Sequence, residues 1–301
     1  MKKLLITGAW RCTDEQCEAL VKMGYDITFM PDERGALPEG AEDAELIVCN
    51  GLFLYHEHTI FPKLVAVQLT SAGLDRVPIA EMSKRGIEVF NARGVYSVPM
   101  AEYALFGVLS LYKESRFFDA AQRAHEWRKH RGILEIKDKR VLIVGAGNVG
   151  TECAVRFRAF GARVYGVDLY PREDESYEKI LPLDRLGDEL SLADIIVLTL
   201  PLTERTRHLI DKDALACVKP SAVLVNIARA AVVDTAALIS ALTEGRIFGA
   251  VLDVFEEEPL SAESPVWDME NVIVTPHNSF VGDGNAERLF GVIKNNLERF
   301  S

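Results

Sequence analysis

The chain has 301 residues, of which 49% are hydrophobic and 26% are charged, so it is long enough and apolar enough for two ordinary globular domains. Its formal net charge of -11 argues against nucleic acid or an anionic membrane surface as a partner, because either would require a basic face. The longest apolar runs are too short for a transmembrane helix or a signal peptide, and we expect neither.

The cysteines are five, scattered, and without the spacing of metal ligands: Cys12, Cys17, Cys49, Cys153 and Cys217. Their odd number and their scatter are typical of reduced, partly buried thiols. We therefore expect a cytoplasmic protein with reduced cysteines and no metal site.

The first ninety residues alternate short β-rich runs with helical or loop segments. The runs are residues 3–6, 27–30, 46–49, 64–68 and 87–90. Between the first two, residues 13–23 have a capping threonine, acidic residues in the first turn and a glycine after the end, which predicts a helix. This alternation predicts a parallel sheet covered on both faces. The region has no phosphate-binding fingerprint, and we expect it to handle the substrate.

Two loops of this region follow strand ends, where ligands of open α/β sheets bind. They are residues 50–52 and residues 70–75. Gly73 in the second loop could let backbone N–H groups point at an anion, although an ordinary tight turn explains this glycine as well.

Residues 91–97 are expected to cross between domains, and a helix with Pro99 in its first turn follows. Residues 100–112 are apolar nearly all round, which indicates burial between units or against a partner subunit. Residues 116–131 become polar and end in the basic cluster RAHEWRKHR. The cluster is either a solvated face or, through Trp127, part of an interface.

Residues 141–144 are an apolar, β-rich run that leads directly into the glycine motif G-x-G-x-x-G. In this motif Gly145 permits a tight turn, Gly147 lets a pyrophosphate approach the backbone, and Gly150 lets the following helix pack closely on the strand. The N-terminus of that helix offers free N–H groups and a positive dipole end to phosphates.

A second β-rich run, residues 163–167, ends in Asp168 at the distance expected for a ribose-binding carboxylate. The carboxylate accepts hydrogen bonds from a ribose diol and repels a ribose phosphate. The motif therefore predicts NAD rather than NADP; the alternatives are a purely structural βαβ unit and a solvated strand-end aspartate.

The β and α alternation continues after the glycine motif. Strands are expected at residues 194–198, 222–227 and 248–252, and helices at residues 183–190, 212–216, 235–244 and 282–300. The predicted fold class is α/β with two doubly wound parallel-sheet domains. A Rossmann NAD-binding domain, residues 93–275, is inserted in a flavodoxin-like substrate domain made of residues 1–92 and 276–301. Two crossings predict two hinges and a cleft that can close.

Three polar residues follow predicted strands of the second domain: Arg229, Glu258 and His277. A guanidinium can hold a carboxylate, and an imidazole beside a carboxylate can carry a proton near neutral pH. This combination suits a keto acid beside a nicotinamide. Read singly, the arginine could cap a strand, the glutamate could be one of three solvated carboxylates, and the histidine could be an ordinary loop residue.

The motifs together resemble the D-isomer-specific 2-hydroxyacid dehydrogenase family. They are GAGNVG (145–150) with Asp168, NIARAAVVD (226–234), GAVLDVFEEEPL (249–260) and VIVTPHNS (272–279), and more weakly SAGLD (71–75) and MAEYAL (100–105). The resemblance implies that Arg229 binds and polarises the substrate, that Glu258 orients His277 and raises its proton affinity, and that His277 is the general acid and base.

The same resemblance implies a homodimer and a set of binding residues. Asp253 is expected at the nicotinamide amide, Asn148 and Val149 at the pyrophosphate, Pro201 and Thr206 at the adenosine side, Ile227 and Ala228 along the cofactor, and the backbone of Ala72 and Gly73 at the substrate carboxylate. Two positions depart from the family pattern: Ala230 replaces the usual glycine, and Phe280 could narrow the site or face the nicotinamide.

We therefore expect an NAD-dependent oxidoreductase that interconverts a small 2-keto acid, of the glyoxylate or hydroxypyruvate type, and its D-2-hydroxy acid. The alternative from another class is an NADH-sensing or corepressor-like protein without turnover. Within the enzyme class, the carboxylate of Glu258 argues against a formate dehydrogenase. The resemblance implies that family members with that activity pair the histidine with a glutamine at this position.

Overall fold

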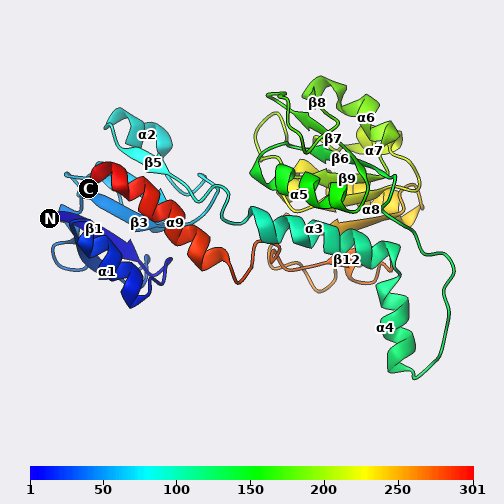
Figure 1. Cartoon of the computed structure of the whole chain (residues 1–301), viewed down its shortest axis with the longest axis horizontal. Helices are drawn as coiled ribbons and strands as arrows, with labels where there is room; N and C mark the ends of the chain where they lie inside the picture. The colour runs from blue at the N-terminus through cyan, green and yellow to red at the C-terminus, as the bar shows by residue number, and fades with distance from the viewer. The chain divides into compact units, whose positions relative to one another are not determined.

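The computed structural model describes residues 1–301 as two compact units, Met1–Tyr96 with Gly282–Ser301 and Ser97–Val281 (Figure 1). Each unit contains one all-parallel sheet with helices on both faces, which confirms the predicted fold class. Residues 276–281 belong to the second unit, whereas the sequence analysis assigned them to the substrate domain. The correction places His277 in the same unit as Arg229 and Glu258. No helix is long and apolar enough to cross a membrane.

The sheet of the first unit has the order β2-β1-β3-β4-β5, which is the flavodoxin-like arrangement. Its strands are β1 (Lys2–Thr7), β2 (Tyr25–Met30), β3 (Leu46–Cys49), β4 (Ala66–Leu69) and β5 (Glu88–Phe90). All residues of β3 and β4 are buried, as expected of central parallel strands that are covered on both faces.

Helices α1 (Asp14–Lys22) and α9 (Asn285–Leu297) cover one face of this sheet, and α2 (Ile79–Lys84) covers the other. The C-terminal helix α9 buries Leu289, Ile293 and Leu297 against the strands, at the spacing of one helical face. Figure 1 shows α9 lying along this unit, so the last twenty residues return to the domain that begins the chain.

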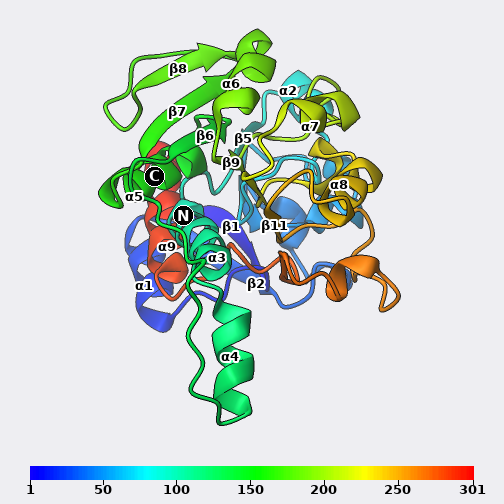
Figure 2. The same cartoon turned by 90° about the vertical axis from the view of Figure 1, so that its right-hand side faces the viewer.

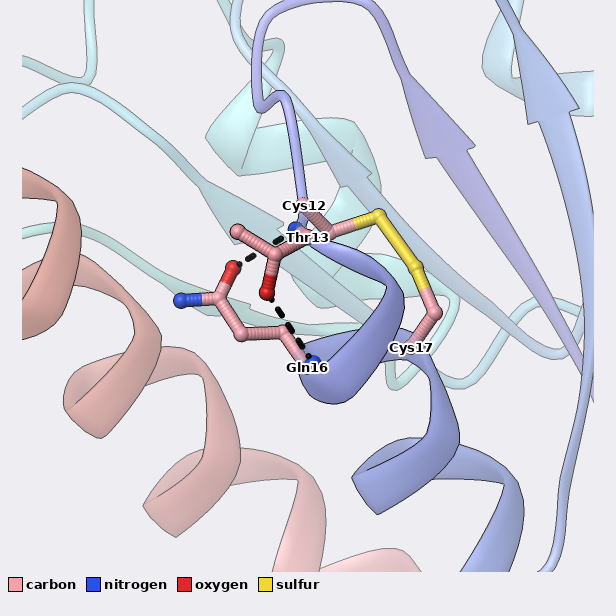
Figure 3. Close-up of a disulfide and its surroundings, with 4 residues drawn as sticks. All are labelled: Cys12, Thr13, Gln16 and Cys17. Atoms are coloured by element: carbon pink, nitrogen blue, oxygen red, sulfur yellow. Dashed lines mark hydrogen bonds between the residues drawn. A yellow bond between two sulfur atoms is a disulfide. The ribbon is translucent and has the colours of Figure 1, made fainter.

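Helix α1 begins with the predicted capping threonine. The Thr13 hydroxyl accepts a hydrogen bond from the Gln16 backbone, and the Gln16 side chain accepts one from the Thr13 backbone. Across this first turn Cys12 and Cys17 form a disulfide (Figure 3). The expectation that all five thiols are reduced is wrong for this pair, because the helix turn places the two side chains next to each other. The other three cysteines are free.

The sheet of the second unit has seven strands in the order β12-β11-β10-β9-β6-β7-β8. They are β6 (Arg140–Val144), β7 (Arg163–Asp168), β8 (Lys179–Pro182), β9 (Ile195–Leu198), β10 (Val223–Asn226), β11 (Gly249–Leu252) and β12 (Val272–Val274). Counted from β6, this is the Rossmann order with one added edge strand, and its switch point lies between β6 and β9. The edge strand β8 was not predicted from the sequence.

Helices α3 (Ser97–Tyr112) and α5 (Asn148–Ala159) cover one face of this sheet. The opposite face carries α6 (Leu186–Leu192), α7 (Lys212–Cys217) and α8 (Thr235–Thr243). Helix α4 (Ser115–Arg123) and the stretch after it project away from the sheet in both views (Figures 1 and 2). We call residues 115–135 the arm.

Candidate active site

The glycine turn after β6 has the geometry of a phosphate cradle. Gly145 has φ +103°, and a Cβ there would lie 2.6 Å from the Leu200 backbone nitrogen. A Cβ at Gly150 would lie 2.2 Å from the Gly145 carbonyl oxygen. At Gly147 a Cβ would meet nothing within 4 Å. Packing therefore requires the outer two glycines, while the middle one faces open space that a ligand can use.

Helix α5 begins at this open space. Its N-cap is Gly147, which has no side chain to cap the first turn. The first backbone N–H groups of an uncapped helix, together with the helix dipole, form a ready anion site. The residues present thus fit the pyrophosphate of a dinucleotide. Its binding by Asn148 and Val149 stays a prediction.

Asp168 ends β7 beside the same turn. Its Oδ2 accepts a hydrogen bond from the Ala146 backbone N–H at 2.7 Å, and its Oδ1 accepts one from Tyr170 N–H at 2.9 Å. These two bonds fix the carboxylate next to the cradle. Each carboxylate oxygen can accept a second bond, so the group can still receive ribose hydroxyls.

The loop after β9, residues 199–206, closes the other side of the turn. Thr199 was not predicted, yet its hydroxyl donates to the Gly145 carbonyl at 2.6 Å and so fixes the first glycine. Thr206 was expected at the adenosine side, but its side chain is 1% exposed. Its hydroxyl donates to the Pro201 carbonyl and accepts from Thr203 N–H, each at 2.7 Å, so this side chain shapes the loop from within.

His277 and Glu258 form the predicted pair. The imidazole Nδ1 lies 2.8 Å from Glu258 Oε2, and the other carboxylate oxygen accepts a hydrogen bond from Phe255 N–H at 3.0 Å. An ionised carboxylate only accepts hydrogen bonds, so Nδ1 carries the proton in this pair. Nε2 is therefore the ring nitrogen that can exchange a proton. The Phe280 ring packs edge-on to the imidazole, with 6.0 Å between the ring centroids.

Three groups act on the pKa of Glu258. Burial by itself raises the pKa, but the hydrogen bonds from His277 and from the Phe255 backbone lower it, and the charges of His277 and Arg229 lower it further. The net pKa lies below its ordinary value. Glu258 is therefore ionised at neutral pH and available to an imidazolium at His277.

Arg229 follows β10 with an exposed side chain. One guanidinium nitrogen donates to the Ala228 carbonyl at 2.8 Å, and the remaining N–H groups are left for an anion. Asn226, which was not predicted, braces this bend: it donates to the Arg229 carbonyl and accepts from Ala228 N–H, each at 3.1 Å. Ile227 is buried, and Ala230 opens a short 3₁₀ turn without any need for the glycine of the family pattern.

Asp253 is fully buried beneath the loop that carries His277. Its carboxylate accepts hydrogen bonds from the Thr275 hydroxyl at 2.7 Å, from Asn278 N–H at 2.8 Å and from Ser279 N–H at 2.9 Å. The structure thus gives Asp253 a structural task that the sequence analysis missed. Its contact with a nicotinamide amide stays a prediction.

The substrate loops expected in the first unit are ordered by polar side chains of that unit. Asn91 donates to the Ala72 carbonyl at 2.7 Å, and the Ser71 hydroxyl donates to the Gly73 carbonyl at 3.1 Å. Both bonds use backbone carbonyl oxygens, so neither involves the backbone N–H groups of Ala72 and Gly73. Binding of a carboxylate by these groups stays a prediction.

Three neighbouring strands bring the catalytic candidates together. In the sheet register Asn226 of β10 is paired with Leu252 of β11, and Leu252 with Val274 of β12. The strands therefore end at one level, and the segments after them carry Arg229, Glu258 and His277. The resulting edge of the sheet combines a fixed cation, a carboxylate and an imidazole, and this combination can hold an anion and transfer a proton to it.

Comparison with known proteins agrees with this geometry. Residues 105–279 match the family model described as "D-isomer specific 2-hydroxyacid dehydrogenase, NAD binding domain". The (S)-sulfolactate dehydrogenase of Chromohalobacter salexigens is 34% identical over 91% of this chain and 90% of its own length. The glyoxylate reductase of Pyrococcus horikoshii is 36% identical over 79% and 74%.

Among solved structures, a D-isomer specific 2-hydroxyacid dehydrogenase from Xanthobacter autotrophicus in complex with NADPH and MES is similar to this chain. The two share 29% identity with a TM-score of 0.80, over 99% of this chain and 95% of the other. The family model spans more than half of the chain, and both relatives align with it over most of their own length. The chain belongs to the D-isomer-specific 2-hydroxyacid dehydrogenase family.

Proposed function

We propose that the protein is an NAD-dependent oxidoreductase that interconverts a small 2-keto acid and its D-2-hydroxy acid, with His277 as the general acid and base. The observation that carries the proposal is the hydrogen bond of 2.8 Å between His277 Nδ1 and Glu258, on the same sheet edge as Arg229. The glycine turn and Asp168 would hold the dinucleotide. When bound, the reduced nicotinamide supplies a hydride.

The side chains divide the remaining work. Arg229 would hold the substrate carboxylate by charge-assisted hydrogen bonds, worth roughly 1.5–3 kcal/mol each. His277 would give the proton on Nε2 to the carbonyl oxygen during reduction and would take it back from the hydroxyl during oxidation. Glu258 keeps Nδ1 occupied, so that only Nε2 exchanges protons, and its charge stabilises the imidazolium.

The substrate class follows from the site and from the relatives. A single guanidinium beside one proton-donating imidazole suits a short 2-keto acid substrate of the glyoxylate or hydroxypyruvate type. One relative is named a glyoxylate reductase. Asp168 favours NAD, because its charge opposes a 2′-phosphate on the ribose. The relative solved with NADPH makes a direct comparison of the two cofactors informative.

The experiment is a substrate panel. Oxidation of NADH and of NADPH is followed with glyoxylate, hydroxypyruvate, pyruvate, 3-sulfopyruvate and longer 2-keto acids. The proposal expects turnover with at least one short acid and a higher kcat/KM with NADH. Tight binding of NADH without oxidation by any acid would favour the sensor function instead.

We further propose that the protein is a cytoplasmic homodimer whose contact includes α3 and the arm. Phe106 on α3 is 55% exposed and lines a shallow, mostly apolar hollow that α3 forms together with Lys113 and Ser115. Trp127 in the arm is 96% exposed. The exposure of these two rings supports the interface reading of the basic cluster, and two copies that exchange arms would cover both of them. Light scattering of Trp127→Ala and Phe106→Ser tests this: the wild type should have twice the chain mass, and a monomeric wild type refutes the proposal.

A further inference from the structure

The loop that carries His277 has a backbone that needs external support. His277 has φ +51°, in the left-handed region that non-glycine residues seldom adopt. Such a residue is stable only where its surroundings fix it. Asp253 supplies much of this support, because His277 N–H donates to the Asp253 carbonyl at 2.8 Å while the carboxylate accepts from the next two N–H groups of the loop.

The carboxylate of Asp253 is itself held through Thr275. The residue is 0% exposed, and the donors that its carboxylate accepts from are all neutral: two backbone N–H groups and the Thr275 hydroxyl. A buried carboxylate depends on such donors, since each missing bond leaves charge uncompensated in a low dielectric. Thr275 has one hydroxyl proton, and the bond to Asp253 uses it.

The hydroxyl oxygen of Thr275 in turn accepts a hydrogen bond from Tyr103 on α3 at 2.5 Å. The direction of these two hydrogen bonds is fixed. A carboxylate can only accept, so the Thr275 hydroxyl donates to Asp253 and must accept from the phenol. Burial raises the pKa of Tyr103, so the phenol keeps its proton at neutral pH and remains a donor. The three residues form a one-way relay from α3 to the loop of His277.

We propose that Tyr103 is a positioning residue for the reaction, which acts through Thr275 and Asp253 to hold the imidazole of His277 against Glu258. The relay lies wholly within the second unit, and Tyr103 is not among the residues that would touch substrate or cofactor. Its hydroxyl polarises the Thr275 hydroxyl and so strengthens the bond to Asp253. The inference rests on the proposed role of His277, and it adds the element that keeps this histidine in one orientation.

Substitutions in the relay give the first test. Tyr103→Phe removes only the donor, and Thr275→Val removes the link. With the best acid of the panel we expect kcat to fall about 2- to 12-fold in Tyr103→Phe, the loss expected for one neutral hydrogen bond, with little change in KM. In Thr275→Val the fall should be roughly 12- to 160-fold, because this variant also removes the hydrogen bond to the charged Asp253 carboxylate. The double variant should lose no more than Thr275→Val alone, because the phenol acts only through the threonine. Thr275→Ser keeps the hydroxyl and should restore kcat.

The matched control is Tyr112→Phe, which removes a hydroxyl from the same helix at a residue that packs on Phe248. It should keep the wild-type kcat. Equal kcat values for Tyr103→Phe, Thr275→Val and the wild type would overturn the proposal, as would a Thr275→Ser variant as slow as Thr275→Val. Full additivity in the double variant would also overturn it.

A second readout is independent of turnover. In ¹⁵N spectra of the imidazoles, His277 is assigned by the signal missing from His277→Gln. We expect a single tautomer protonated at Nδ1 in the wild type, and mixed tautomers in Tyr103→Phe and Thr275→Val. If the wild type reduces no 2-keto acid of the panel, the proposed function fails, yet the tautomer comparison still tests the relay: identical spectra in all variants refute it.

Discussion

Alanine at Gly147 should leave the fold intact and weaken NADH binding. The added Cβ meets nothing within 4 Å, and φ −77° with ψ −161° is open to any residue. A Gly→Ala change at a compatible position stabilises a fold by about 0.4–1 kcal/mol through the unfolded chain. The methyl group would occupy the space where a pyrophosphate approaches the backbone. Loss of one charge-assisted hydrogen bond, roughly 1.5–3 kcal/mol, corresponds to about 10- to 160-fold weaker binding.

Alanine at Gly150 is the matched control with the opposite expectation. Its Cβ would lie 2.2 Å from the Gly145 carbonyl oxygen and 3.1 Å from a methyl group of Ile143. Backbone has to move to relieve such contacts, at a cost of about 1–3 kcal/mol. At about 2–4 °C per kcal/mol, the melting temperature of the free protein should fall by several degrees.

Thermal unfolding with and without NADH separates the two effects. A ligand at 100 times its Kd stabilises the native state by about 2.7 kcal/mol, so the wild type should melt several degrees higher with NADH. When free, Gly147→Ala should melt at the wild-type temperature or a few degrees above it, and it should gain little from NADH. A fluorescence titration gives its Kd directly. Wild-type affinity in Gly147→Ala would refute the cradle, and a free melting temperature as low as that of Gly150→Ala would refute the packing argument.

Three further outcomes are expected. His277→Ala should lower kcat by about 10²- to 10⁴-fold and leave the Kd of NADH unchanged, as measured by fluorescence titration; wild-type turnover would contradict the acid–base role. The pKa of Glu258 lies below its ordinary value of 4.5, so its ionisation stabilises the fold at higher pH, and that contribution is lost as the pH falls through the lowered pKa. In urea titrations the free energy of unfolding of Glu258→Gln should lack this pH dependence. Parallel pH profiles for the variant and the wild type would contradict it. Maleimide should label only Cys217 in the native protein, and Cys12 and Cys17 as well after dithiothreitol. Burial raises the pKa of the Cys49 and Cys153 thiols, so these two should react only in urea. Labelling of Cys12 before reduction would contradict the disulfide.

The Rossmann sheet could be predicted from the sequence because its central strands are buried on both faces. Strands β6, β9 and β10 are apolar runs bounded by turns, and they stand out without any alignment. Strand β8 was missed since it lies at the edge: of its four residues only Ile180 is buried, so neither a continuous run nor an alternation marks it. Helix α2 has six residues, too few for a helical period to show.

The candidate residues of the site could be picked out from the sequence for a related reason. Arg229, Glu258 and His277 each stand where an apolar strand ends, and a polar residue there is visible in the linear sequence. The relay that supports them is not visible. Tyr103 and Thr275 are 172 positions apart, and a tyrosine in an apolar helix and a threonine after a strand are unremarkable alone. Hydrogen bonds of this kind exist only after the fold has formed.

The sheet order also explains why the ligand must be extended. Asp168 lies at the end of β7, and the segments with Glu258 and His277 follow β11 and β12. In the order β12-β11-β10-β9-β6-β7 these ends are four and five strands apart, which at about 4.8 Å per strand is roughly 19–24 Å. In their proposed roles, Asp168 and the pair of Glu258 and His277 would therefore serve opposite ends of one molecule, and the cradle after β6 lies between them. A mononucleotide could occupy only one end, whereas a dinucleotide with its pyrophosphate at α5 can use both.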